Sequence, residues 1–242
     1  VFIKHKFDLL QTVTGCERHT RYGIHAIDSQ GDSKGHPIFK AHEKSSWCVR
    51  NCLAAHCQPF NMKISNSDPV SSEIDGSEFL FLQRDCRCTF LCCNRPEMTV
   101  NYVEKGAQER LGKITNPCLC CGLGADVLDP AENAKYYIRG SCCQLGLCCS
   151  GCPCDTCQIV QFTLTNPSGE AVGTLEKRSQ GCLKTMISDA DSFSMVYPAG
   201  ASPRDKALLM SSVMLLDFTY FKKNPADKKR REDGLLDNLQ QQ

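Results

Sequence analysis

The chain has 242 residues, of which 41% are hydrophobic and 23% are charged. This balance excludes a wholly disordered protein and supplies enough apolar residues for one large core or two small ones. The 28 Lys and Arg residues nearly match the 27 Asp and Glu residues, which argues against a globally basic nucleic-acid binder and against a strongly acidic protein. Because no charged and apolar leader follows Val1, we expect the natural start to be absent, together with an N-terminal region that could bind protein partners.

Short apolar runs with a period of two dominate the chain, and turns rich in Gly, Pro, Asn and Asp separate them. Both features are typical of strands joined in a meander. In chain order the runs lie at 7–13, 21–27, 37–39, 60–64, 78–82, 98–103, 111–114, 126–129, 135–138, 162–164 and 172–175, with a strand-like run at 183–187. The pattern predicts a mostly β protein with about a dozen short strands in a closed or sandwiched antiparallel sheet.

One segment, residues 207–221, departs from this pattern because it is apolar around the whole circumference of a helix. Ser202 is placed to cap the helix, Pro203 suits its first position, and Asp205 lies where a capping box needs an acceptor. We therefore expect a helix over residues 203–221. Its characteristic residues are Leu208, Leu209, Val213, Leu215, Leu216 and Asp217.

This helix could span a bilayer or thread the interior of a barrel, and its length favours the second. The apolar segment extends about 22 Å, whereas the hydrocarbon layer is about 30 Å thick, and Asp217 would be costly in lipid. We expect the helix to thread the interior of a β-barrel, in a single domain of residues 1–221. Residues 222–242 carry six basic and four acidic residues, and we expect a disordered basic tail that could also meet anionic lipid.

Cysteine is unusually frequent, with 19 residues that gather in runs such as 86–93, 118–121 and 142–157. The odd number and the adjacent pairs argue against a disulfide scaffold, because neighbouring cysteines rarely meet the geometry of a bridge. A reduced, cytosol-facing compartment fits this pattern better.

The cysteine runs have three interpretations. Two Cys-x2-Cys pairs between Cys149 and Cys157 could bind Zn²⁺ within the run Cys142–Cys157, although zinc sites usually separate such pairs by a longer loop. The thiols could instead carry palmitoyl chains near a membrane, where several chains anchor a protein firmly. Isolated residues such as Cys16 and Cys182 fit a third role, as small hydrophobic side chains.

Several segments together resemble the phospholipid scramblase family. They are Arg21–Tyr22, the cysteine run after Arg84, the hairpin at Leu111–Ile114 before Asn116–Cys118, the string Ile187–Phe193 followed by Tyr197–Pro198, and the helix end at Leu215–Phe218. Their order extends the resemblance over residues 5–222. It implies a closed antiparallel barrel of about twelve strands around one hydrophobic C-terminal helix, similar to the Tubby C-terminal domain.

The resemblance also implies a function at membranes. Scramblases are expected to move phospholipids between leaflets in both directions, with stimulation by calcium, without ATP and without chemical catalysis. We expect the protein at the cytoplasmic face of the plasma membrane, where homo-oligomers or bilayer distortion would supply the polar path that one short helix lacks. The alternative is a membrane-tethered, Tubby-like adaptor that binds lipid or protein and transports nothing. No nucleic-acid module, catalytic triad spacing or Gly-rich phosphate loop is recognisable, so neither nucleic-acid binding nor enzyme chemistry is expected.

The resemblance also implies a calcium site, although this chain has only part of the family's pattern. The EF-hand-like loop would begin at Asp189 and use Asp189, Asp191, Phe193 and the backbone carbonyl of Met195. Its twelfth position is Gly200 instead of an acidic residue, so we expect weak Ca²⁺ binding. The two aspartates could instead form an ordinary turn.

Two groups of residues are candidates for contact with the membrane. The palmitoylation candidates are Cys86, Cys88, Cys92 and Cys93, which match the family's cluster, and Cys148 and Cys149, which extend it. The candidates for contact with anionic lipid, and above all for the adaptor, are Lys177, Arg178, Lys228, Lys229, Arg230 and Arg231.

Overall fold

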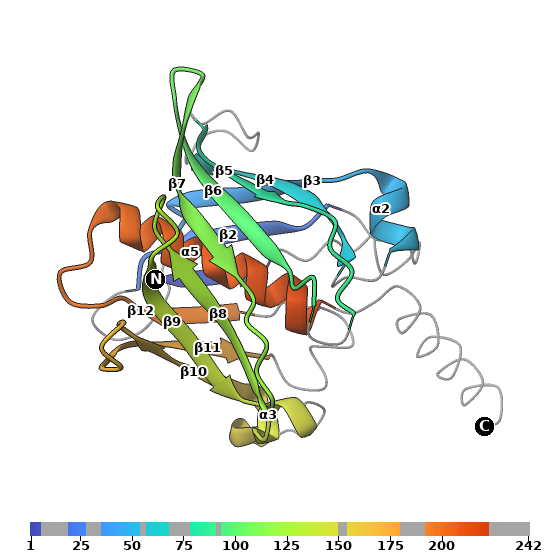
Figure 1. Cartoon of the computed structure of the whole chain (residues 1–242), viewed down its shortest axis with the longest axis vertical. Helices are drawn as coiled ribbons and strands as arrows, with labels where there is room; N and C mark the ends of the chain where they lie inside the picture. Colours follow the sequence, from blue (N-terminus) through green and yellow to red (C-terminus); the bar gives the residue numbers. More distant parts are fainter. Residues whose placement is uncertain are drawn as a thin grey trace.

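Twelve strands close into one antiparallel barrel within the residues that the computed structural model describes, which are 1–5, 19–27, 35–53, 57–67, 78–90, 93–149, 154–179 and 192–222 (Figure 1). The strands are β1 (Phe2–His5), β2 (Arg21–His25), β3 (Phe39–Lys44), β4 (Phe60–Asn66), β5 (Glu78–Arg84), β6 (Glu97–Glu104), β7 (Ala107–Thr115), β8 (Gly122–Leu128), β9 (Ala134–Ser141), β10 (Ile159–Thr165), β11 (Ala171–Arg178) and β12 (Ser192–Val196). Each strand pairs with its neighbours in the chain, and β12 closes the barrel against β1, with Phe193 opposite Ile3. The predicted barrel is therefore confirmed.

Alternation of side chains builds the wall of the barrel. In β4, Phe60, Met62 and Ile64 are buried while Asn61 is exposed, because successive side chains of a strand point to opposite faces. The same period directs Leu80 and Leu82 of β5 into the interior and leaves Gln83 exposed. Two strands, β1 and β12, were not predicted, and the predicted strands at 7–13 and 183–187 fall outside the described residues.

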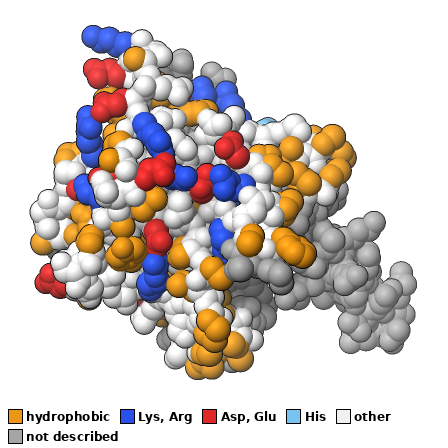
Figure 2. Space-filling model, viewed as in Figure 1, with side chains coloured by type: hydrophobic (Ala, Val, Ile, Leu, Met, Phe, Trp, Pro, Cys, Tyr) orange, Lys and Arg blue, Asp and Glu red, His pale blue; other side chains and the backbone are white. Residues whose placement is uncertain are grey.

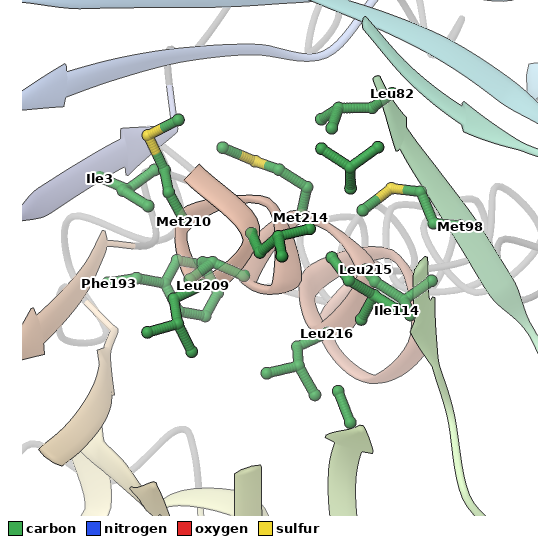
Figure 3. Packing of buried hydrophobic residues seen from close by; sticks show 14 of the residues in the cluster. Ile3, Leu82, Met98, Ile114, Phe193, Leu209, Met210, Met214, Leu215 and Leu216 are labelled. Carbon is green, nitrogen blue, oxygen red and sulfur yellow. The ribbon is translucent and has the colours of Figure 1, made fainter. Parts of the chain in front are cut away.

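The helix α5 (Pro203–Leu216) runs through the middle of the barrel and continues as a π-helical turn, η3 (Asp217–Phe221) (Figure 1). Figure 3 shows side chains of α5 directed toward the surrounding strands, among them Leu209, Met210, Met214, Leu215 and Leu216 facing Ile3, Leu82, Met98, Ile114 and Phe193. Every apolar residue from Leu208 to Leu216 is at most 3% exposed. The helix expected to thread the barrel is confirmed, and each fully buried Leu or Met contributes about 1.5–3 kcal/mol.

The start of α5 follows the predicted capping box. Ser202 accepts a hydrogen bond from the Asp205 backbone, Asp205 accepts one from the Ser202 backbone, and Pro203 opens the helix. Asp205 also forms an ion pair with Lys135 of β9. On the wall, a Cβ at Gly112 would clash with the Leu128 backbone oxygen and lie 3.1 Å from the Leu208 side chain, so glycine is needed where the helix approaches β7.

A cluster of buried polar side chains surrounds the other end of the helix. The Tyr22 hydroxyl donates a hydrogen bond to Asp217 (2.5 Å), and the Lys222 ammonium donates to Gln58 (3.1 Å) and lies 4.2 Å from the centre of the Phe218 ring. Protein atoms, not lipid, therefore surround the carboxylate of Asp217. Within the described part of the chain, no helix combines the length and the apolar character needed to span a bilayer.

Glu43 completes this polar group. Its carboxylate accepts hydrogen bonds from the Thr20 backbone (2.9 Å) and the Ser45 hydroxyl (2.5 Å), and lies 3.8 Å from the Lys222 ammonium. Burial acts to raise the pKa of Glu43, but Lys222 and the hydrogen bonds outweigh it, so the pKa lies below its usual value. Glu43 is therefore charged at neutral pH and stabilises the end of the helix.

Replacing Glu43 with Gln should lower the free energy of unfolding by about 1.5–3 kcal/mol at pH 7, because hydrogen bonds to a charged group are lost. A lowered folded-state pKa stabilises the fold fully above the ordinary glutamate pKa of about 4.3, and this stabilisation disappears as the pH falls through the folded-state value. Urea unfolding should therefore show the gap between parent and Glu43→Gln closing at acid pH. The control is Glu132→Gln, at an exposed ion pair with Arg110, where the expected change in the free energy of unfolding is within about 0.5 kcal/mol. If the difference between the parent and Glu43→Gln did not depend on pH, Glu43 would not be a charged group that stabilises the fold.

Candidate functional site

The topology of the barrel places all the described cysteines at the same end. In an antiparallel meander alternate connections lie at the same end, and here one end receives the connections 6–20, 45–59, 85–96, 116–121, 142–158 and 179–191. All 19 cysteines of the sequence fall in these six segments. The connections at the opposite end, 26–38, 67–77, 105–106, 129–133, 166–170 and 197–202, contain none. We call the first the cysteine end.

Most of the described thiols are exposed. Of 15 described cysteines, all free, 13 are exposed, and Cys57 and Cys157 are buried. The palmitoylation candidates Cys86, Cys88, Cys93, Cys148 and Cys149 are all exposed, and Cys92 lies outside the described residues. Sequence reasoning named the runs with Cys118, Cys120, Cys121, Cys142, Cys143 and Cys154 without choosing these residues as acylation candidates, and it did not single out Cys48 and Cys52; all eight are exposed. Counting the predicted strands between runs would have placed them at the same end.

Two short helices contribute to the cysteine end. They are α2 (Trp47–Cys52), between β3 and β4, and α3 (Leu145–Cys148), followed by the 3-10 turn η2 (Asp155–Gln158) before β10. Figure 2 shows hydrophobic side chains, a class that includes cysteine, gathered over α2 at the right and α3 at the bottom. Charged side chains are more frequent over the upper and central parts of the same view. On this face, α2 and α3 therefore present mainly hydrophobic side chains.

Not all of these thiols have the same reactivity. Burial raises the pKa of Cys57 to about 11, and a hydrogen bond that its thiol donates to Cys88 and the charges of Cys88 and Cys86 add to this effect. Arg84, 2% exposed, lies nearby, and burial lowers its pKa to about 10, against the opposing effect of Cys57 and Cys86. Because the thiolate is the nucleophile, Cys57 is a poor candidate for acylation.

Two vicinal pairs of thiols face one another across β8 and β9. The sulfur atoms of Cys120 and Cys121 are 3.9 Å apart, and those of Cys142 and Cys143 are 3.8 Å apart. A backbone hydrogen bond from Cys142 to Cys121 (3.2 Å) joins the two connections. No three His, Cys, Asp or Glu side chains of the described residues are placed to hold a metal ion. Because Cys152 of the predicted zinc site lies outside those residues, zinc in the run Cys142–Cys157 stays a prediction.

The segment predicted to bind calcium contains a strand. Asp189 and Asp191 lie outside the described residues. Phe193 and Met195 belong to β12, which pairs with β1 on one side and β11 on the other, and both side chains are 1% exposed. The Met195 carbonyl, a predicted ligand, accepts a hydrogen bond from the Val1 nitrogen (2.7 Å). The fourth to eighth positions of the predicted loop are therefore barrel wall and not an open EF-hand turn, and calcium binding stays a prediction.

The two described candidates for contact with anionic lipid differ in exposure. Lys177 is 5% exposed, and its ammonium donates to the Ser179 hydroxyl (3.1 Å) and lies 4.7 Å from the centre of the Phe221 ring. It is directed into the barrel and not toward a membrane surface, whereas Arg178 is exposed. The tail residues Lys228, Lys229, Arg230 and Arg231 lie outside the described part of the chain.

A cavity of about 800 Å³ opens at the end opposite the cysteines. It lies between the first turns of α5 and the wall, with apolar residues such as Phe39, Phe79 and Met210 in its lining and Arg204 and Lys206 among its polar residues. Its volume falls in the range of small-molecule pockets, about 300–1,000 Å³. The cavity is thus a second candidate site with a largely apolar lining.

Known proteins resemble this chain over most of its length. The Scramblase family model matches residues 1–223. Phospholipid scramblase 1 of Rattus norvegicus is 25% identical over 241 residues, covering 95% of this chain and 62% of the relative. Phospholipid scramblase 1 of Homo sapiens is 24% identical, with 95% and 65% covered, and phospholipid scramblase 2 of Bos taurus is 25% identical, with 91% and 68% covered.

These relatives are longer than the chain, which spans less than two thirds of the length of the scramblase 1 proteins that it matches. No solved structure matches the chain. The family match nevertheless covers nearly every residue of the barrel and of its central helix. The chain therefore belongs to the Scramblase family.

Proposed function

We propose that this protein is a membrane-tethered, scramblase-like protein that moves phospholipids between leaflets in both directions, without ATP and with stimulation by calcium. The observation that carries the proposal is the family match over residues 1–223. The relatives are named phospholipid scramblases, which supports phospholipids as the molecules bound and no chemical change as the outcome. The cytoplasmic face of the plasma membrane is the location we propose.

The cysteine end supplies the tether. One acyl chain holds a protein to a bilayer only marginally, whereas two or more give stable anchoring. Five described palmitoylation candidates are exposed and lie on two connections at one end of the barrel, so their chains could enter a single membrane plane. The barrel would then stand with the C-terminal end of α5 toward the bilayer.

The filled interior of the barrel limits the mechanism. Side chains of α5 and the wall occupy the space that a lipid headgroup would need, and moving a charged headgroup through hydrocarbon is costly without a polar path. We therefore place the lipid path outside the barrel, in bilayer distorted by the docked protein or between copies of it.

The same filled interior favours a second candidate function, a membrane-tethered adaptor that binds lipid or protein without transport. In that case the exposed Arg178 and the basic tail with Lys228, Lys229, Arg230 and Arg231 would contact anionic lipid. Transport across reconstituted vesicles separates the two functions.

Proteoliposomes with fluorescent phospholipid on both leaflets test the proposed function. We expect dithionite to quench well beyond the outer-leaflet half when the protein is present, and faster quenching when calcium is added. Protein-free vesicles give the baseline. Quenching that stops at this baseline, with or without calcium, would reject phospholipid transport and favour the adaptor function.

Acylation should be selective among the thiols. In protein from eukaryotic cells we expect hydroxylamine-sensitive mass shifts on peptides with Cys86, Cys88, Cys93, Cys148 and Cys149, and none at the buried Cys57 and Cys157. Replacing the five exposed residues with Ser should shift the protein from the membrane to the soluble fraction, whereas Cys57→Ser with Cys157→Ser should not. Acyl groups found only on Cys57 or Cys157 would contradict the tether that we describe.

Calcium should bind weakly through the carboxylates of Asp189 and Asp191. Calorimetric titration should show heat for the parent that disappears in Asp189→Asn with Asp191→Asn. The same change at Asp129, an acidic residue of an exposed turn at the opposite end, is the control. Equal heats for all three proteins would show that Asp189 and Asp191 do not form a calcium site.

A further inference from the structure

Three large apolar side chains project from the cysteine end. Trp47, Phe90 and Leu145 are 57%, 76% and 53% exposed. They come from three separate connections, β3–β4, β5–β6 and β9–β10. Exposed apolar side chains gathered on one part of a surface mark a site of interaction, whereas single ones are ordinary.

Local structure holds each of these side chains in place. Trp47 opens α2, whose Arg50 is buried and bonded to Ser45. Phe90 lies in a tight turn closed by two backbone hydrogen bonds with Cys93 (3.3 and 3.0 Å).

Leu145 opens α3, which packs so tightly on β10 that a Cβ at Gly146 would clash with the Ile159 carbonyl. Because α3 contacts β10 and α2 lies over a separate part of the barrel (Figure 1), the three side chains are spread around the rim of the same end.

The charges of the connections orient the barrel. In the described connections the cysteine end carries two acidic and three basic residues, whereas the opposite end carries three acidic residues and one basic residue. An anionic bilayer surface therefore favours the cysteine end over the opposite end.

We propose that the cysteine end docks on a phospholipid bilayer by inserting Trp47, Phe90 and Leu145 before any thiol is acylated. The proposal rests on the proposed function in placing the protein at a membrane, and it adds the residues and the orientation of the contact. A bilayer suits these residues because aromatic side chains favour the membrane interface and binding grows with the apolar area inserted. Docking in this way would bring the surrounding thiols to the plane where acyl chains enter lipid.

The single tryptophan of the chain makes the test direct, because fluorescence reports on Trp47 alone. The 242-residue chain would be purified from bacteria, without palmitoylation, and mixed with vesicles of phosphatidylcholine and phosphatidylserine. We expect Trp47 emission to shift to shorter wavelength, to be quenched by brominated acyl chains, and to follow sedimentation of the protein with vesicles.

Matched variants test the orientation. Phe90→Asp with Leu145→Asp should weaken vesicle affinity by about tenfold or more, since the inserted apolar area is lost. The control, Val196→Asp, makes the same kind of change at an exposed apolar residue of the opposite end that does not line the cavity (59%) and should leave affinity unchanged. Thermal unfolding monitors the fold of both variants.

Three results would overturn docking. The first is unshifted Trp47 emission in protein that sediments with vesicles, and the second is an equal loss of vesicle affinity in both variants. The third is a loss of self-association in place of vesicle binding, which would make this end an interface between copies of the chain. The tests of docking and of transport can fail independently. Vesicle binding without dithionite-sensitive transport would retain docking and reject the proposed function. Transport with unshifted Trp47 emission would reject docking and retain the proposed function.

Discussion

A helix that is apolar on every side must be surrounded by apolar atoms, and in this protein the wall of the barrel provides them. Residues Leu208 to Leu216 contact strands all around the barrel, and their burial needs both the alternation of the wall and the close approach at Gly112. The polar ends of the helix are satisfied by protein as well, through Asp205 with Lys135 at one end and Asp217 with Tyr22 at the other. The helix thus serves as the core of the domain, and contact with a membrane is left to the surface.

The meander then divides the surface into two unlike ends. Because alternate connections share an end, one end collects the described cysteines together with Trp47, Phe90 and Leu145, and the cavity lies at the other. The exposed thiols, the exposed apolar side chains and the balance of charge all favour the cysteine end as the one that faces lipid. This agreement among independent features supports the orientation that we propose.

Much of the fold follows from local signals, whereas the candidate site depends on topology. Alternation predicts most strands, and Ser202 with Asp205 predicts the start of α5. The strand β12 was missed because nearby aspartates suggested a calcium loop, and α2 and α3 are too short to show a helical period. The burial of Lys177 depends on Phe221, which is distant in sequence. The common end of the cysteine runs appears only when strand parity is counted along the whole meander.

Hydrogen–deuterium exchange on the vesicle-bound protein tests the central claim most directly, because it reports on both ends of the barrel and on the helix in one experiment. The account predicts that vesicles slow exchange in the described connections of the cysteine end, 45–53 and 85–90, and leave exchange in α5 and in the hairpin turns 105–106 and 129–133 as it is in solution. Vesicle-induced change of exchange in α5, or protection of those hairpin turns, would contradict a barrel that keeps its helix inside and presents its cysteine end to the membrane.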